Sequence, residues 1–289
     1  MHILIIYNPK SGTASAIEGI KKAFKAEGET PEFLAITDPS LRRKAKAFAT
    51  RRHAVLVAAG GDGTVNCVAT LAVESHSRMG VIPTGTLNHF AKDAAIPLKM
   101  EDAVAAIVHG KTIRVDSASV KNRVFVNNSS IGLYPQSLRL RKKFREIIGN
   151  IPAAFVGLAS VIARPRRYRL ELTVDGKKMV RRTPFVFVGN NPYAINPKGL
   201  FVRSELTRGT LAIYVVRAQN PWQIIRMAAH AIFTRKRRTP DFDILYAQRC
   251  TIRSRHSKLH VALDGEVAHL QTPLTYAVLP KSLRVIVPR

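Results

Sequence analysis

Residues 54–66 read AVLVAAGGDGTVN and contain the most informative turn of the sequence. The stretch opens with an uninterrupted apolar run, which is typical of a parallel strand buried on both faces. Gly60, Gly61 and Gly63 then supply a turn whose main chain has conformational freedom and no side chains to keep a phosphate away. The helix expected to follow offers free N–H groups at its start. The stretch therefore predicts a phosphate-binding turn between a strand and a helix.

Three polar side chains accompany these glycines. Asp62 lies in the middle of the predicted anion site, where a carboxylate is unfavourable unless a cation lies beside it, so we expect Mg²⁺ there, bound directly or through water. Thr64 offers a hydroxyl to phosphate, and Asn66 can brace the loop. The alternative is an ordinary connecting turn. A P-loop and a Rossmann dinucleotide fingerprint are excluded, because neither GxxxxGK[ST] nor GxGxxG with an acidic residue at the expected distance is present.

Two more turns should lie at the same edge of the sheet. The segment PTGTLNHF follows a predicted strand and contains Gly85, which frees the turn, and Thr86 and Asn88, which add short polar groups. The segment NPKSG begins at Asn8, closes the first strand and supplies Lys10, whose alternative role is that of a solvated surface charge. Parallel sheets bind ligands at the carboxyl ends of their strands. Together, the three turns predict a ligand site.

The order of elements predicts two domains. Strands and helices alternate in residues 1–115, which predicts an α/β N-terminal domain with a mostly parallel, Rossmann-like sheet. In residues 116–289 strand-like segments follow one another, which predicts a mainly antiparallel β C-terminal domain with helical interruptions near 137–163 and 221–233. The predicted strands are 3–7, 33–36, 54–59 and 80–82, then 112–120, 123–128, 168–174, 178–188, 210–217, 248–254, 258–263, 274–278 and 283–287.

The motifs NPKSG, GGDGTVN and PTGTLNHFAK, in this order and spacing, resemble the catalytic domain of diacylglycerol kinases and sphingosine kinases, above all the bacterial lipid kinases of that family. NAD kinases share a GGDG turn but have no counterpart to the second turn. The resemblance implies a lipid kinase with ATP bound to the first domain and the active site between the two domains. The nucleotide contacts that it implies are Asn8, Thr37, Gly60, Gly61, Asp62, Gly63, Thr64, Asn66 and Thr86.

The late triplet Asp264-Gly265-Glu266 fits the same family, and the resemblance implies that Glu266 takes the catalytic place in the second domain. Asp116 matches another acid of that site. A lipid hydroxyl is a poor nucleophile, and a carboxylate that accepts its proton is typically worth ~10²–10⁴-fold. We therefore expect Glu266 to be the general base, Asp116 to orient it or share its role, and Asp62 to hold the metal. Without the resemblance, Asp264-Gly265 is simply a hairpin turn.

Two residues depart from the family pattern. His89 stands where some members have Asp, and its imidazole could pair with Asp62 or with a phosphate. Arg208 stands where several bacterial relatives carry the Asp of an accessory metal site. Because an arginine does not ligate a cation, we predict that the accessory metal is absent.

The charge of the chain points to anionic partners. Its 289 residues include 46 Lys and Arg against 19 Asp and Glu, a formal net charge of +27. Basic clusters border apolar helical stretches, which favours binding to an anionic membrane surface over simple core helices with solvated ends. Aromatic residues make up only 7% and do not alternate with basic ones, so we expect no specific nucleic-acid partner. The clusters are Arg139, Arg141, Lys142, Lys143 and Arg145, then Arg164, Arg166, Arg167 and Arg169, then Arg235, Lys236, Arg237 and Arg238.

The two cysteines form no CxxC pair, and no signal peptide or membrane-spanning stretch is predicted. We therefore expect a cytoplasmic enzyme that associates peripherally with the inner face of the membrane and phosphorylates a lipid substrate. Two alternatives are a kinase of a soluble hydroxyl substrate such as a nucleotide, and a non-catalytic lipid-binding or nucleotide-binding protein that retains the fold. The sequence leaves the identity of the lipid and the oligomeric state open.

Overall fold

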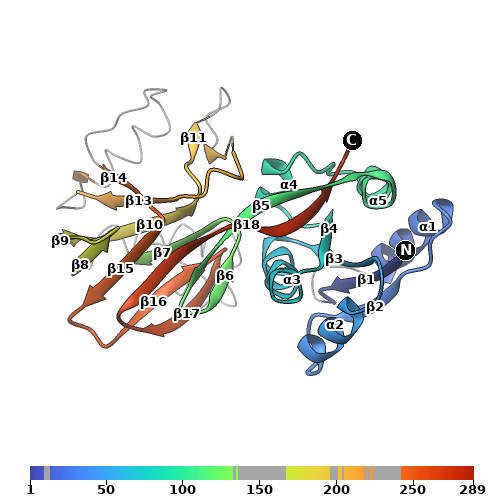
Figure 1. Ribbon diagram of the computed structural model, residues 1–289, viewed down its shortest axis with the longest axis horizontal. Helices are drawn as coiled ribbons and strands as arrows, with labels where there is room; N and C mark the ends of the chain where they lie inside the picture. The colour runs from blue at the N-terminus through green and yellow to red at the C-terminus, as the bar shows by residue number, and fades with distance from the viewer. Residues whose placement is uncertain are drawn as a thin grey trace.

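The structure is a computed structural model that describes residues 1–9, 14–132, 135, 167–195, 201–203, 205–217, 220, 222–223 and 242–289. Two lobes lie side by side, an α/β lobe that contains the N-terminus and a larger β lobe (Figure 1). A ten-stranded sheet runs through both lobes, and a six-stranded sheet packs on it in the β lobe. This architecture confirms the predicted fold class.

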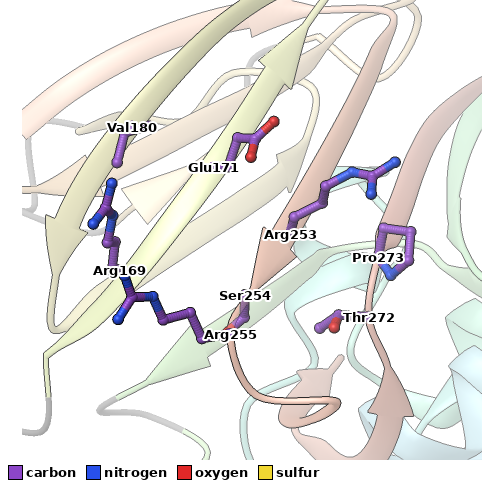
Figure 2. A pocket seen from close by; sticks show the side chains of 8 residues that line it. All are labelled: Arg169, Glu171, Val180, Arg253, Ser254, Arg255, Thr272 and Pro273. Atoms are coloured by element: carbon purple, nitrogen blue, oxygen red, sulfur yellow. The ribbon is translucent and has the colours of Figure 1, made fainter.

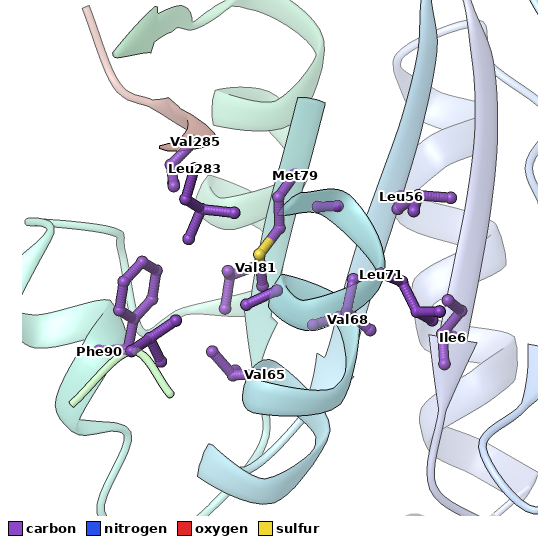
Figure 3. Packing of buried hydrophobic residues seen from close by; sticks show 14 of the residues in the cluster. Ile6, Leu56, Val65, Val68, Leu71, Met79, Val81, Phe90, Leu283 and Val285 are labelled. Atoms are coloured by element: carbon purple, nitrogen blue, oxygen red, sulfur yellow. The ribbon is translucent and has the colours of Figure 1, made fainter. Parts of the chain in front are cut away.

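The α/β lobe is built on four parallel strands, in the order β2-β1-β3-β4. Apolar side chains on one face of these strands, such as Leu4 and Leu56, pack with helices α2 and α3, and those on the other face, such as Ile5 and Val57, pack with α1 and α5. Figure 3 shows the first of these two cores around α3. The strands are β1 (His2–Tyr7), β2 (Glu32–Ala35), β3 (Ala54–Gly60) and β4 (Arg78–Pro83). The helices are α1 (Ala14–Ala26), α2 (Leu41–Ala49), α3 (Asp62–Ser75), α4 (His89–Asp93) and α5 (Met100–His109).

The β lobe is a sandwich of antiparallel strands. Inward-facing residues of the large sheet, such as Leu172 and Tyr276, meet those of the six-stranded sheet, such as Val188 and Val261, in one buried core. Alternate residues of each strand point out of the sandwich, as expected for a sheet with one buried face. The strands are β5 (Lys111–Val120), β6 (Arg123–Phe125), β7 (Asn128–Gly132), β8 (Tyr168–Val174), β9 (Lys177–Thr183), β10 (Phe185–Asn190), β11 (Ala194–Ile195), β12 (Phe201–Val202), β13 (Leu211–Val216), β14 (Phe242–Ala247), β15 (Arg249–Ser254), β16 (Lys258–Leu263), β17 (Glu266–Gln271) and β18 (Leu274–Val287).

The last strand, β18, belongs to both lobes (Figure 1). Its first half pairs with β15, both halves pair with β5, and its end pairs in parallel with β4, where Val285 lies opposite Met79. The sequence predicts two separate strands here, at 274–278 and 283–287. The structure has one strand with a shift of register between Leu279 and Leu283, where Lys281 adopts a positive φ of 51°.

Other differences from the predicted elements are local. The segment 178–188 is split into β9 and β10 at Pro184, and 123–128 ends at Phe125 before β7 begins. Nearly all of the helical stretches predicted at 137–163 and 221–233 lie outside the described residues, and the division of the chain at residue 115 stays a prediction. Within the described ranges, no helix combines the length and apolar character needed to cross a membrane.

Candidate active site

The four parallel strands of the α/β lobe end together. Tyr7 at the end of β1 is in register with Ala35 at the end of β2 and with Ala59 near the end of β3, and Gly60 is in register with Pro83 at the end of β4. The segments that follow the strands therefore begin side by side at one edge of the sheet, which is the arrangement that the spacing of the motifs predicts.

Three of the predicted nucleotide contacts at this edge have side chains that solvent can reach. Asn8 is partly exposed, and Thr37 and Thr86 are exposed, so all three are accessible to a ligand above the strand ends. Lys10 lies outside the described residues. The contribution of each to nucleotide binding stays a prediction.

The glycine-rich turn leads directly into α3. Gly61 occupies the N-cap position in an extended conformation (φ −87°, ψ −172°) and has no side chain to cap the helix. Because the first N–H groups of a helix lack partners within it, this start of α3 can receive an anion. Thr64 is only 3% exposed, and a Cβ placed on Gly60 would lie 2.3 Å from its Oγ1. The Thr64 side chain thus folds over Gly60, and only glycine fits beneath it.

The second turn packs against the first. A Cβ placed on Gly85 would lie 2.4 Å from the Cα of Gly61, so the two main chains touch at glycine positions. Asn88, in the left-handed region at φ 51°, closes the second turn: its Nδ2 donates to the Gly85 carbonyl (2.7 Å) and its Oδ1 accepts from the Gly85 N–H (3.1 Å). Gly85 and Asn88 therefore shape the site through the main chain.

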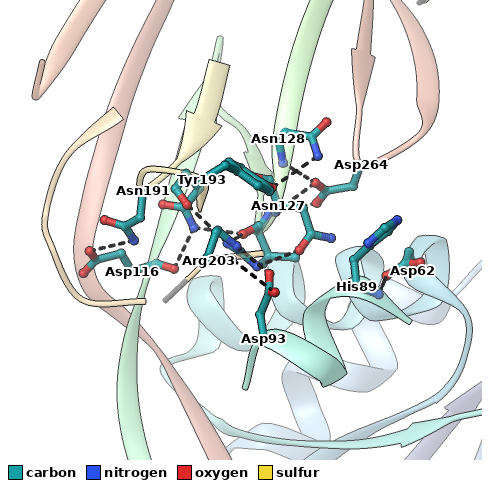
Figure 4. A network of polar contacts seen from close by, with 12 residues as sticks. Asp62, His89, Asp93, Asp116, Asn127, Asn128, Asn191, Tyr193, Arg203 and Asp264 are labelled. Atoms are coloured by element: carbon teal, nitrogen blue, oxygen red, sulfur yellow. Dashed lines mark hydrogen bonds and ion pairs between the residues drawn. The ribbon is translucent and has the colours of Figure 1, made fainter. Parts of the chain in front are cut away.

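Asp62 links the two turns. Its Oδ1 accepts a hydrogen bond from the backbone N–H of His89 at 2.9 Å, at the first residue of α4 (Figure 4). The contact uses the main chain of His89, so it does not depend on the imidazole. One carboxylate oxygen of Asp62 holds α4 in place, which leaves the other oxygen for a ligand.

Glu266 of the β lobe lies against the glycine-rich turn. It follows a two-residue hairpin turn between β16 and β17, in which Asp264 and Gly265 both have positive φ (45° and 89°). A Cβ placed on Gly63 would lie 3.1 Å from Glu266 Oε1. Burial raises the pKa of the Cys67 thiol, and the negative charge of Glu266 raises it further. The hairpin therefore brings Glu266 to Gly63 in the first turn of α3, and Gly63 directly follows Asp62 in the sequence.

Asp264 fixes this hairpin. Its carboxylate is buried and accepts the backbone N–H groups of Val126, Asn127 and Asn128 at 2.8–2.9 Å. Burial raises its pKa to about 6, while the three N–H donors and nearby Arg203 act in the opposite direction. In the amide orientation that satisfies its neighbours, Asn66 donates from α3 to Asp264 Oδ2 at 3.1 Å. Asn66 thus braces the other lobe, where the sequence predicts that it braces its own loop.

Asp116 is 2% exposed, and both of its carboxylate oxygens are occupied. Oδ1 accepts the backbone N–H of Lys281 (2.8 Å), and Oδ2 accepts the backbone N–H of Gly209 (2.7 Å) and the amide of Asn191 (3.1 Å). The carboxylate therefore ties the bulge of β18 to the segment before β13, and both of its oxygens are hydrogen-bonded within the β lobe. Arg208, which precedes Gly209, is exposed, and its Cζ lies 5.9 Å from the centre of the Tyr246 ring.

Arg203 and Asp93 join the lobes and were missed by the sequence analysis. Arg203 Nε donates to Asp93 Oδ2 at 2.7 Å, and its NH2 group donates to Asn127 Oδ1 at 2.8 Å (Figure 4). The guanidinium also donates to the carbonyls of Val126 and Asn190. No sequence pattern singles out Arg203 among so many basic residues, because its importance depends on burial and on a partner 110 positions away.

The residues around α3 fit a shared magnesium ion better than a dedicated metal cage. Within the described part of the chain, no group of three or more His, Cys, Asp or Glu side chains is arranged to hold a metal. Magnesium commonly uses one or two carboxylates together with waters and substrate phosphates. Asp62, with one carboxylate oxygen left, provides such a donor beside the predicted phosphate site, and waters and phosphates would complete the set.

The protein combines a parallel α/β lobe, which has a glycine-rich turn at its strand ends, with a β sandwich that brings an acid to that turn. This combination defines a two-lobed phosphotransferase that uses an alcohol group as acceptor. Residues 2–120 match the family described as diacylglycerol kinase catalytic domain, and residues 139–287 match the YegS C-terminal NAD kinase beta sandwich-like domain. The chain therefore belongs to the diacylglycerol kinase-like family, whose kinase activity implies the use of ATP.

Relatives support this assignment along the whole length. Proteins named diacylglycerol kinase from Staphylococcus aureus strains JH9 and NCTC 8325 are 26% identical over 292 residues, which cover 98% of this chain and 91% of each relative. A crystal structure of a diacylglycerol kinase from Bacillus anthracis str. Sterne has a TM-score of 0.71 at 20% identity and covers 99% of this chain and 96% of that chain. A second structure from the same organism has a TM-score of 0.78 at 23% identity and covers 99% and 97%.

Proposed function

We propose that this protein transfers the γ-phosphate of ATP to the hydroxyl group of a lipid, diacylglycerol or a related lipid, at a membrane surface and with Mg²⁺. The single observation that supports this most strongly is the position of Glu266 against Gly63 at the start of α3. A carboxylate from the β lobe beside a phosphate-binding turn of the α/β lobe is the arrangement required to remove a proton from an acceptor hydroxyl.

In this proposal the α/β lobe holds the nucleotide. The uncapped start of α3 receives phosphate through main-chain N–H groups, and Gly61 and Gly85 keep that surface free of side chains. Asp62 would hold the magnesium ion, which neutralises charge on the phosphates when it is bound. Asp62 also fixes α4 through the N–H of His89, so it supports the second turn while it faces the ligand.

The β lobe presents the base. The Glu266 carboxylate accepts the proton of the lipid hydroxyl, the hydroxyl oxygen forms a bond to the γ-phosphorus, and the bond from that phosphorus to the bridging oxygen of ADP breaks. Asp264 does not reach the substrate in this scheme, because it is buried and holds the hairpin that carries Glu266. Asp116, buried and fully hydrogen-bonded, acts as a positioning residue for the β lobe.

The membrane part of the proposal rests on charge. The formal net charge of +27 favours an anionic surface, and with it a peripheral location on the inner face of the membrane. Most of the predicted basic clusters (residues 139–145, 164, 166 and 235–238) lie outside the described residues. Of the second cluster, Arg167 and Arg169 are described and exposed.

Phosphate transfer from labelled ATP to a panel of lipids in mixed micelles tests the proposal. We expect product with a hydroxylated lipid, and we expect Glu266→Gln to lower kcat by about 10²-fold or more, the range typical of a lost general base. Asp62→Asn should also lose most activity. A soluble hydroxyl compound tested without micelles distinguishes a lipid kinase from a kinase of soluble substrates.

Glu101→Gln and Asp102→Asn are matched controls, since they make the same chemical changes at exposed positions in the first turn of α5. Both control variants should keep the rate of the unmodified protein, and circular dichroism should show that all four variants are folded. Wild-type rates in both Glu266→Gln and Asp62→Asn would overturn the assigned roles. ATP binding without any product would overturn the kinase proposal itself.

A further inference from the structure

A basic pocket lies on the outer face of the β lobe, far from the glycine-rich turn. It has a volume of about 420 Å³, and the described residues that line it include three arginines, Arg169, Arg253 and Arg255, and one acid, Glu171. Figure 2 shows Arg169 and Arg255 on one side of Glu171 and Arg253 on the other. Strands β8 and β9, which contribute to the pocket, lie at the opposite end of the molecule from β1 (Figure 1). The pocket is therefore separate from the proposed kinase site.

The strand register explains how these charges gather. Glu171 on β8 is directly opposite Arg253 on β15, so both side chains emerge from the same face of the sheet. The intervening residues, such as Leu170 and Ile252, point the other way into the core and are fully buried. Arg169 emerges two residues before Glu171 on the same face. The alternation of polar and apolar residues therefore directs the arginines outward onto one surface.

Among the described residues, no ion pair neutralises the arginines of the pocket. In the described parts of the β lobe, ion pairs join Arg181 and Arg217 to Asp243, and none involves Arg169, Arg253, Arg255 or Glu171. Arg169 is also directly opposite Arg182 on β9, and like charges in that position destabilise a sheet. A surface that keeps repelling charges together, with one acid among three arginines, is complementary to an anion.

Protection of an exposed sheet edge is the simplest competing explanation, because charged side chains on edge strands discourage pairing between molecules. In the described sheet β9 is an edge strand, so edge protection accounts for Arg182 and the other basic residues of β9. It does not account for Arg253, because β15 is an interior strand that pairs with both β8 and β18.

We propose that this pocket binds a phosphate-bearing anion. The planar fork of an arginine matches phosphate oxygens in pairs, and the volume lies within the range of small-molecule sites. The lining has no aromatic side chain on which a base could stack, and its apolar part is limited to Val180 and Pro273 beside the aliphatic stems of the arginines. A polar headgroup or a small phosphate ester fits these properties, whereas an acyl chain or a nucleic-acid base does not.

Two binding experiments on the full chain, both without ATP, test the proposal and separate the sources of the phosphate. In the first, inorganic phosphate and glycerol phosphate are titrated by calorimetry. In the second, the protein is sedimented with phosphatidylcholine vesicles that do or do not contain phosphatidylglycerol. The double variant Arg253→Gln/Arg255→Gln is compared with Arg52→Gln/Arg114→Gln, which removes the same charge from exposed arginines that do not line the pocket.

The pocket variant should bind about 30-fold more weakly, because it removes two arginines and each contributes ~1 kcal/mol to the binding of an anionic surface. The control variant should lose much less, and Glu171→Gln should bind more tightly because it removes the only acid of the pocket. A selective loss in the titration identifies a soluble phosphate compound, and a selective loss only with vesicles identifies a lipid headgroup. Absence of binding in both experiments, or equal losses in the pocket and control variants, overturns the proposal. Neither result bears on kinase activity, since no ATP is present.

Discussion

Arg203 and Asp93 form a buried ion pair that joins the β lobe to α4, the helix that follows the second turn, with Nε and Oδ2 2.7 Å apart and the two side chains 0% and 6% exposed. The same guanidinium donates to the carbonyl of Val126 and to the side chain of Asn127, in the segment whose N–H groups hold Asp264. One side chain therefore connects α4, which Asp62 also contacts, with the hairpin that presents Glu266.

Removing Arg203 should destabilise the protein strongly. Arg203→Gln leaves Asp93 buried without its partner, and breaking a buried pair in this way costs about 3–5 kcal/mol. Urea denaturation measures the change in the free energy of unfolding. Arg51→Gln is the control, because the Arg51–Glu32 pair is exposed (44% and 57%) and such a pair contributes about 0–1 kcal/mol. Similar losses in both variants would contradict a special role for the buried pair.

Gly85→Ala should impair nucleotide binding. The added methyl group would lie 2.4 Å from the Cα of Gly61, and since main chain cannot swing aside as a side chain does, one of the two turns must move. We expect KM for ATP to rise about tenfold or more, which corresponds to ~1.4 kcal/mol. Steady-state kinetics at varied ATP measure the effect. Gly19→Ala, whose methyl group would meet only the flexible side chain of Met100 at 3.4 Å, should leave KM unchanged.

Asp264 should lower the stability of the protein as the pH rises, which is the opposite of the usual effect of a carboxylate. Its pKa is raised to about 6 in the folded protein from the ordinary value of 3.8, so the folded state binds the proton more tightly than the unfolded state. The contribution of Asp264 to stability is therefore largest at acid pH and falls by up to about 3 kcal/mol as the pH rises from about 4 to 7.

The difference in unfolding free energy between the unmodified protein and Asp264→Asn, measured by urea denaturation across this pH range, isolates that titration. We expect the difference to decline with rising pH. A rise with pH would mean that the three backbone N–H donors and Arg203 stabilise the charged carboxylate by more than burial penalises it.

Asp116→Asn distinguishes a positioning role from a catalytic one. The substitution turns one of the two oxygens into an amide N–H₂, which must then face the N–H of either Gly209 or Lys281, and this should cost about 1–3 kcal/mol of stability. Well below the melting temperature, kcat should fall far less than it does in Glu266→Gln. A loss of kcat equal to that of Glu266→Gln, in a protein that is still folded and equally stable, would instead place Asp116 in the chemistry.

The sequence predicted the site best where a short local pattern determines the main-chain conformation. The glycines at 60, 61, 63 and 85 predicted both the turns and their shared edge, because glycine spacing after an apolar strand constrains the main chain directly. The Asp264-Gly265 pair predicted a hairpin, and the structure has one.

Roles that depend on burial could not be predicted in the same way. Nothing in the sequence shows that Arg203 is buried or that Asn66 reaches Asp264, since both facts arise from the packing of the two lobes. The continuity of β18 was also hidden, because Pro280 looks like the end of a strand in the sequence. In the structure the strand continues past it through a shift of register and a positive φ at Lys281.

Because β18 pairs with strands of both lobes, the α/β lobe cannot complete its sheet early in biosynthesis. In the described sheet, the outer side of β4 pairs with two residues that come late in the sequence, Arg284 and Val285. While the polypeptide emerges from the ribosome, the α/β lobe therefore keeps an unpaired strand edge until those residues have been made. Such open edges attract other chains. Nascent molecules of this protein should consequently depend on chaperone protection until translation has passed β18.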